Sequence, residues 1–138
     1  MAGCIANALL ENEVSVCMTK IIDVLNMSFQ DKYEHINQIC SKELLILDDF
    51  GTERESEYGM EIIYEIIDRR YISRKPLIVT TNLPLSTLQN PTDQEHERIY
   101  SRLLTMTVPI QFFSGDFRFR ERIEKNKIAK SIFSERGD

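Results

Sequence analysis

Two adjacent carboxylates, Asp48 and Asp49, are the residues of this chain whose type and position best suit chemistry. They follow four consecutive aliphatic residues at 44–47 and precede Phe50 and Gly51. Carboxylate oxygens are ligands that Mg²⁺ prefers, and a second acid beside the ion can polarise an attacking water. The pair therefore predicts a site for Mg²⁺ and a nucleotide phosphate. The alternative is a simple turn, because Asp-Asp-Phe-Gly also suits a loop.

The aliphatic run before the acids is typical of a buried parallel strand, whose carboxyl end faces a ligand crevice. A second apolar run at 76–82 also ends in polar residues, and apolar residues at helical spacing separate the two runs. We expect helices at 2–12, from a Thr19 cap to Leu25, at 29–40, 57–71, 86–88 and 93–104, and strands at 14–18, 44–50, 76–82 and 108–112.

The segment 108–112 is expected to be the edge strand of the sheet, because an edge tolerates Pro109. Strands that alternate with helices predict an α/β fold, a three-layer sandwich with a mostly parallel sheet. We expect residues 1–138 to form a single domain, with 119–138 as a helical tail that frays.

Composition limits the classes of function. The chain has 138 residues and a formal charge of −5, which argues against coating nucleic acid by bulk electrostatics. No run approaches the roughly 20 apolar residues that cross a bilayer, so we expect a cytoplasmic protein without a membrane partner. The three cysteines are widely spaced, which favours small buried residues of a reducing compartment over a disulfide frame or a zinc site.

Several segments together carry a resemblance to a known family. They are the helix at 5–10, the run Leu44-Leu45-Ile46-Leu47-Asp48-Asp49-Phe50-Gly51-Thr52-Glu53-Arg54, the helix at 66–71, and Lys75-Pro76-Leu77-Ile78-Val79-Thr80-Thr81-Asn82-Leu83. In this order they resemble the AAA+ ATPase domain of bacterial and phage DnaC/DnaI-type helicase loaders and of the IstB-like ATP-binding family. The resemblance covers roughly residues 4–120 and implies a P-loop NTPase fold.

The resemblance implies roles for the residues at the strand ends. Asp48 would be the Walker B acid associated with Mg²⁺, and Asp49 the catalytic acid. Asn82 would orient the attacking water or the γ-phosphate, and Thr81 would contact the nucleotide. Asn82 precedes Leu83 and Pro84, so it also suits the start of a turn.

Arginines complete the site in the family. Arg102 is the first candidate for the finger that reaches the nucleotide of a neighbouring protomer, and Arg98 is the second. A planar guanidinium suits the spread charge of a phosphoryl transition state, although either arginine also suits a solvated helix face. Arg118 would touch the nucleotide of its own chain, and Arg120 is the alternative.

The chain departs from the family in one important respect. It lacks the phosphate-binding loop GxxxxGK[ST], and no glycine run precedes Lys20, Lys32 or Lys42. In the family this Walker A loop comes just before the helix at 2–12, so we expect an AAA+ domain that is incomplete at its N-terminus. Such a chain should bind ATP poorly and lack ATPase activity alone, whether it is a fragment, a truncated reading frame or a natural variant.

The resemblance also implies ligands and partners: ATP and Mg²⁺ as cofactors, the replicative hexameric helicase of the primosome, single-stranded DNA, and self-association through the arginine-finger face. Phe29, Lys32 and Tyr33 are the candidate DNA contacts, because aromatic rings beside a cation can stack on unpaired bases. Aromatic residues at this spacing also serve helix packing. The leading interpretation is therefore part of a helicase loader for DNA replication. The alternatives are an IstB-type transposition helper and a nucleotide-free interaction module.

Overall fold

The structure is a computed structural model that describes residues 2–52 and 56–112. Its elements in chain order are α1 (Ala2–Glu11), β1 (Val16–Lys20), α2 (Ile21–Leu25), α3 (Phe29–Ser41), β2 (Leu44–Phe50), α4 (Glu57–Ser73), β3 (Leu77–Thr81), α5 (Leu85–Gln89) and α6 (Gln94–Met106). The predicted alternation of helices and strands is confirmed up to α6, with boundaries shifted by at most two residues.

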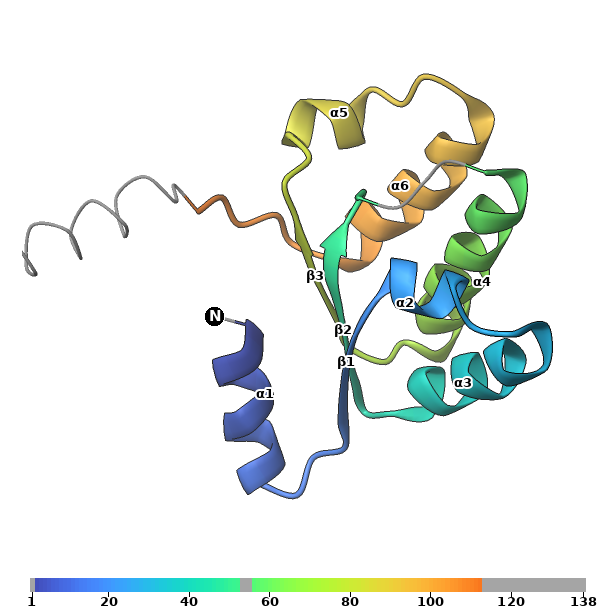
Figure 1. Ribbon diagram of the computed structural model, residues 1–138. Helices are drawn as coiled ribbons and strands as arrows, with labels where there is room; N and C mark the ends of the chain where they lie inside the picture. The colour runs from blue at the N-terminus through green and yellow to red at the C-terminus, as the bar shows by residue number, and fades with distance from the viewer. Residues whose placement is uncertain (1, 53–55, 113–138) are drawn as a thin grey trace, which may run out of the picture.

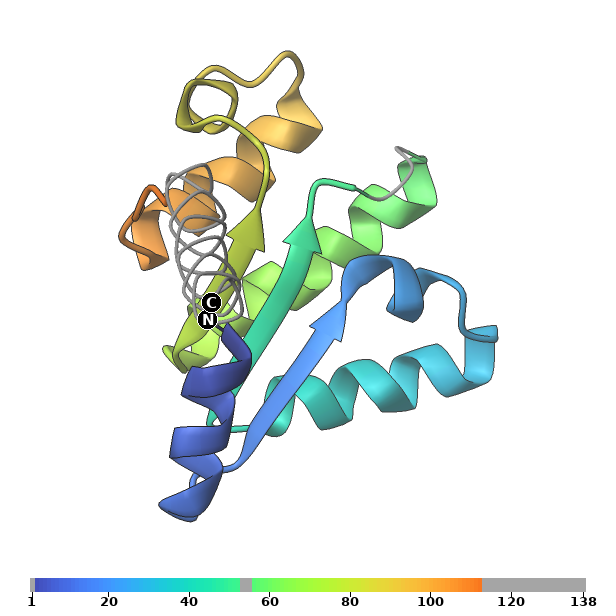
Figure 2. The ribbon, with the colours of Figure 1, turned by 60° about the vertical axis from the view of Figure 1, so that its left-hand side comes forward.

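The three strands form a parallel sheet in the order β1-β2-β3. Figure 2 shows the three arrows pointing the same way. Val16 pairs with Leu44 at one end of β1, and Lys20 pairs with Asp48 at the other. This register brings the carboxyl ends of all three strands to one edge of the sheet, where parallel sheets carry their ligand sites.

The central strand β2 is buried because helices cover both of its faces. Leu45, Ile46 and Leu47 have no exposed surface, and Leu44 is only 5% exposed. A continuous aliphatic run is the pattern of a parallel strand covered on both sides. The sequence prediction of a buried strand before the acids is therefore confirmed.

The two faces of the sheet are covered unequally. Within residues 2–52 and 56–112, α1 is the only helix on one face (Figure 1), where Ala2 and Ala6 pack against Leu44 and Ile46 of β2. The larger core on the other face joins β2 to α2, α3, α4, α5 and α6. The polypeptide therefore changes face between α1 and the helices that follow β1.

Helix α4 shows how the sequence builds the larger core. Its residues Ile62, Ile63, Ile66 and Ile67 are at most 2% exposed and form one face, as the sequence predicted. The side chain of Ser56 caps the helix by accepting a hydrogen bond from Gly59 N at 3.0 Å. The burial of this face holds β2 and β3 in place.

Two expected features of the backbone are wrong. Thr19 does not cap α2: it lies inside β1, and Lys20 occupies the cap position without a side-chain hydrogen bond. Residues 108–112 form no strand. Pro109 has no N–H to donate, and the apolar side chains of Val108 and Ile110 are 84% and 72% exposed, so nothing in the described structure holds this segment in a sheet.

The cysteines are less buried than expected. Cys4 is exposed on the outer side of α1, whereas Cys17 and Cys40 are partly buried against the larger core. Burial raises the pKa of both Cys17 and Cys40 above the usual thiol value. These two thiols behave as small core residues, as the sequence predicted, and Cys4 does not.

None of the helices in residues 2–52 and 56–112 is both long enough and apolar enough to cross a membrane. The predicted tail at 119–138 lies outside the described residues.

The guanidinium of Arg70 joins three elements at the amino edge of the sheet. Arg70 is fully buried, and its Nη1 donates to the carbonyl oxygens of Cys40 at 3.1 Å and Lys42 at 2.7 Å. Its Nη2 donates to the carbonyl oxygens of Glu43 at 3.2 Å and of Pro76. One side chain therefore ties α4 to the end of α3 and to the chain entering β2 and β3.

Replacing Arg70 with methionine should destabilise the fold by about 3 kcal/mol or more, because it leaves several buried carbonyl oxygens without donors. Urea unfolding followed by circular dichroism measures the change. Arg69→Met is the control, since Arg69 is partly exposed and pairs with Glu65 at 2.6 Å. The control should lose under about 1 kcal/mol. Equal losses in the two variants would contradict the role of Arg70.

Candidate functional site

A β-bulge presents the two acids at the carboxyl edge of the sheet. Leu47 pairs with Val79 and Phe50 with Thr81, so Asp48 and Asp49 together stand opposite the single residue between those partners on β3. Asp49 has a left-handed backbone with φ of 54°. In a regular strand consecutive side chains point to opposite faces, and a bulge changes the direction of one of them. The bulge therefore lets both acids serve one site.

The hydroxyl of Thr80 holds this bulge. Thr80 Oγ1 donates to Asp48 Oδ1 at 2.5 Å and accepts the backbone N–H of Asp49 at 3.0 Å. A left-handed aspartate costs about 1 kcal/mol relative to the ordinary backbone, and side-chain hydrogen bonds offset part of that cost. Thr80 thus fixes the orientation of one acid and the backbone of the other.

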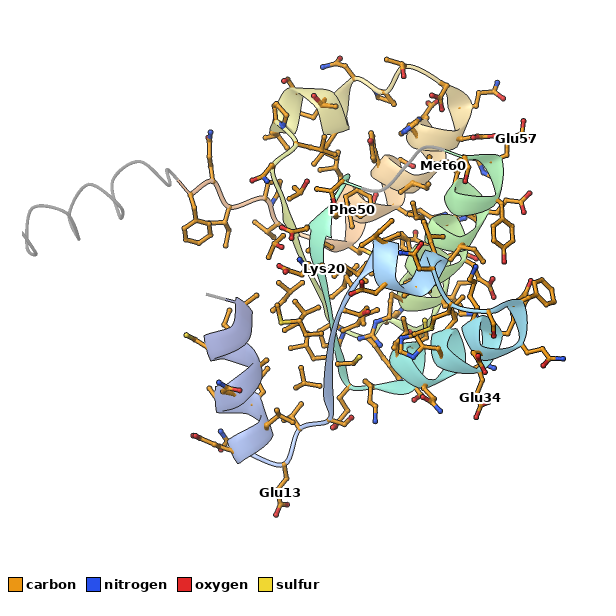
Figure 3. The ribbon with its side chains drawn as sticks, viewed as in Figure 1. Glu13, Lys20, Glu34, Phe50, Glu57 and Met60 are labelled. Atoms are coloured by element: carbon orange, nitrogen blue, oxygen red, sulfur yellow. The ribbon has the colours of Figure 1, made fainter. Side chains whose placement is uncertain are left out.

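Lys20, at the end of β1, reaches the second acid. Its Nζ lies 2.8 Å from Asp49 Oδ2, and the two side chains are 46% and 44% exposed. The hydrogen bond to Asp49 raises the pKa of Lys20 above its usual value, and the charges of Asp49, Asp48 and Asp23 raise it further. Figure 3 shows Lys20 where β1 passes into α2, next to the end of β2. The edge of the sheet therefore carries two acids and one ammonium group.

The donor set at this edge suits a hard divalent cation. Asp48 and Asp49 offer carboxylate oxygens and Thr80 a hydroxyl, which are the ligand types that Mg²⁺ takes together with water and substrate phosphates. No group of three or more His, Cys, Asp or Glu side chains gathers into a metal site within 2–52 and 56–112. The residues fit Mg²⁺ bound through few protein ligands, and they do not form an all-protein cage.

The chain turns sharply after the acids. Gly51 has φ of 91°, and a Cβ at this position would lie 2.5 Å from Leu83 Cδ1. Thr81 Oγ1 donates to Phe50 O at 2.6 Å and accepts from Leu83 N at 3.0 Å. Only glycine allows this close approach without strain. The turn after β2 and the turn after β3 are thus fastened together beside the acids.

Comparisons with known proteins identify relatives of this chain. The scan against family models finds no match. The chain is 29% identical over 111 residues to the replicative helicase loader DnaC of Escherichia coli strain K12, an alignment that covers 75% of this chain and 44% of that protein. The chain is homologous to the DnaC helicase loader. It spans less than half the length of this curated relative.

Solved structures give the same fold. The crystal structure of DnaI superposes with a TM-score of 0.66 and 27% identity, over 77% of this chain and 62% of that one. A crystal structure of a DNA replication initiation factor gives a TM-score of 0.68 at 20% identity, over 88% of this chain and 38% of that one. The predicted α/β fold of the AAA+ type is confirmed. The parallel sheet and its helices match those of the DnaC and DnaI relatives.

Two of the residues that the DnaC/DnaI resemblance assigned lie after or at the end of β3. Asn82 is exposed directly after β3, on the edge that carries the acids. The hydroxyl of Thr81 is engaged with Phe50 and Leu83, and the neighbouring hydroxyl of Thr80 contacts Asp48. The structure therefore groups Asp48, Asp49 and Asn82 at one edge, as the order of the strands predicted.

The arginine-finger candidates lie on α6 and face α4. Arg102 Nη1 lies 2.5 Å from Asp68 Oδ1, and its Nη2 donates to the hydroxyl of Tyr64 at 3.0 Å. Arg98 is exposed, and its guanidinium lies 4.3 Å from the centre of the Tyr64 ring. Both arginines are therefore held by their own chain in this structure. Arg118 and Arg120 lie outside the described residues.

The candidate DNA contacts separate into two groups. Phe29 and Tyr33 form an exposed edge-to-face pair on α3, with ring centroids 5.2 Å apart and exposed fractions of 66% and 41%. Lys32 is only 4% exposed, and its ammonium lies 4.7 Å from the centre of the Tyr58 ring on α4. The aromatic pair is thus accessible, whereas Lys32 points toward α4 and away from solvent.

The sequence interpretation missed Lys20, Thr80 and Arg70. A signal existed for two of them: Thr80 belongs to the polar end of β3, and Arg70 follows Ile66 and Ile67 at the spacing of the buried helix face. Nothing in the sequence points to Lys20, because its contact depends on the strand register and on the bulge.

Replacing Thr80 with valine should release the bulge, because valine has the same shape and no hydroxyl. The amide of Asp49 would lose its acceptor, so its hydrogen exchange measured by NMR should accelerate about tenfold and the fold should lose about 1–3 kcal/mol. Thr80→Ser keeps the hydroxyl and should stay close to the parent chain in both measurements. Equal exchange rates in the valine variant and the parent would rule out this role.

Proposed function

We propose that this chain is part of a replicative helicase loader, in which the acids at the carboxyl edge of the sheet serve ATP and Mg²⁺. The observation that carries the proposal is the grouping of Asp48, Asp49, Thr80 and Asn82 at one sheet edge, in a chain homologous to DnaC. Asp48 would hold Mg²⁺ and Asp49 would accept a proton from the attacking water. Asn82 would orient that water or the terminal phosphate. Bound Mg²⁺ would neutralise charge that develops on the phosphate.

The handedness of the connections supports the position of a phosphate-binding loop before α1. The crossovers from β1 to β2 and from β2 to β3 place their helices on one face, and α1 lies on the other. Parallel connections are right-handed in nearly all proteins. A parallel strand connected to β1 through α1 must therefore run on the far side of β3. Its carboxyl end and the loop after it would then lie beside Asp48 and Asn82.

A chimera tests this assignment. The strand and phosphate loop of the Escherichia coli DnaC relative are joined before Ala2, and ATP turnover is measured. We expect Asp49→Asn to lower turnover by roughly 100-fold or more, since it removes a proton acceptor, with little change in Mg-ATP affinity. Asp23→Asn is the control, because Asp23 is an exposed acid on α2 with the same loss of charge. Equal turnover in the chimera and its Asp49→Asn variant would contradict the proposal.

The partners follow from the same proposal. The replicative hexameric helicase and single-stranded DNA are the proposed partners, and a second copy would receive Arg102. To reach a neighbouring protomer, Arg102 would have to leave its ion pair with Asp68. If Arg98 acted in its place, it would have to leave the ring of Tyr64. We propose the exposed pair of Phe29 and Tyr33 as the surface on which unpaired bases stack.

Replacing both Phe29 and Tyr33 with alanine should weaken binding of a fluorescein-labelled oligothymidylate by roughly tenfold, because stacking on aromatic rings stabilises single strands. Fluorescence anisotropy measures the affinity. Tyr71→Ala is the control, since Tyr71 is 42% exposed on α4. If the double variant and the control bind equally, the aromatic pair has a packing role only.

A further inference from the structure

The contact between Lys20 and Asp49 places a positive charge on the acid that the proposed function assigns to water activation. The ammonium lies 2.8 Å from Asp49 Oδ2. This oxygen cannot accept a proton from water or bind a cation along the same direction while the ammonium donates to it. At this oxygen the contact with the ammonium therefore competes with the proposed role of Asp49.

The contact follows from the architecture of the sheet edge. Lys20 is the last residue of β1 and pairs in register with Asp48, so its side chain begins beside the acid pair. The bulge then brings the carboxylate of Asp49 within reach of β1. The hydroxyl of Thr80 donates to Asp48 at the same time, so the two acids have different partners. One acid is held by a neutral hydroxyl and the other by a cation.

The ion pair between Lys20 and Asp49 is weak enough to break and form again readily. Both side chains are nearly half exposed, and exposed ion pairs contribute little to stability because water and salt screen them. The lysine stem is long and flexible, so its ammonium can move into solvent while the backbone stays in place. A divalent cation carries twice the charge of the ammonium and can take its place at the carboxylates.

We propose that Lys20 is an internal counter-ion, whose ammonium occupies the carboxylate of Asp49 until a divalent cation displaces it. This inference rests on the proposed function, because that function supplies the cation and the role of Asp49. It adds that the acid pair is neutralised in part by its own chain before any ligand arrives. Lys20 is accordingly a positioning residue, and it weakens cation binding in the resting protein.

The affinity of the 138-residue chain for Mn²⁺, measured by electron paramagnetic resonance, tests the proposal. Lys20→Met should bind Mn²⁺ roughly 30-fold more tightly than the parent, the effect of one unit charge on a divalent ion about 4 Å away in a water-like dielectric. Lys20→Arg keeps the charge and should match the parent. Lys75→Met is the charge-matched control, because Lys75 lies before β3 at the opposite end of the sheet and donates to Ser41 O.

The outcomes separate this proposal from the function on which it rests. A gain in Lys20→Met that disappears when Asp49→Asn is added supports the counter-ion. Equal Mn²⁺ affinity in the parent and Lys20→Met, including no binding in either, overturns it, and so does an equal gain in Lys75→Met. Turnover of the chimera that depends on Asp49 is measured separately, so the proposed function can stand when the counter-ion fails. If Lys20→Met raises the Mn²⁺ affinity but the chimera shows no turnover that depends on Asp49, the counter-ion stands and the proposed ATPase function fails.

Discussion

The buried guanidinium of Arg70 is the constraint on which the sheet depends. A buried cation is costly unless donors and acceptors around it are matched, and burial lowers the pKa of Arg70 from its usual value. Its charge is met by main-chain carbonyl oxygens of Cys40, Lys42, Glu43 and Pro76. Those carbonyls belong to the end of α3 and to the entries of β2 and β3, so one planar group sets the spacing of the strands at their amino ends.

The opposite end of the same strands carries the strain. There the ladder between β2 and β3 is interrupted, Asp49 takes a left-handed backbone, and a threonine hydroxyl replaces a ladder hydrogen bond. A sheet fixed at its amino edge tolerates this distortion, because the buried residues Leu45 to Leu47 keep the strand in register up to the bulge. Rigid packing at one end thus allows polar groups to be concentrated at the other.

Local patterns were enough to predict the elements and the edge that carries the acids. The aliphatic run of β2 is continuous and its strand is buried on both faces, whereas the isoleucines of α4 recur at helical spacing and form one buried face. Contacts that join distant segments were not predictable in the same way. Lys20 meets Asp49 only because β1 and β2 are neighbours in a particular register and because the bulge turns the acid. The strand expected at 108–112 fails for the same reason: alternating apolar residues suit a strand, but no strand among the described residues pairs with this segment.

Charge at the edge of the sheet explains why the acids alone are a poor nucleotide site. Asp48 and Asp49 bring two formal negative charges to this edge, and Lys20 offsets one of them. A nucleotide triphosphate arriving at this edge would meet net negative charge, and the exposed lysine is screened by water. Binding therefore needs a divalent cation together with backbone N–H groups such as those of a phosphate loop. The same balance favours a lysine over a neutral residue at position 20, because an unpaired acid beside Asp48 would repel its neighbour whenever the cation is absent.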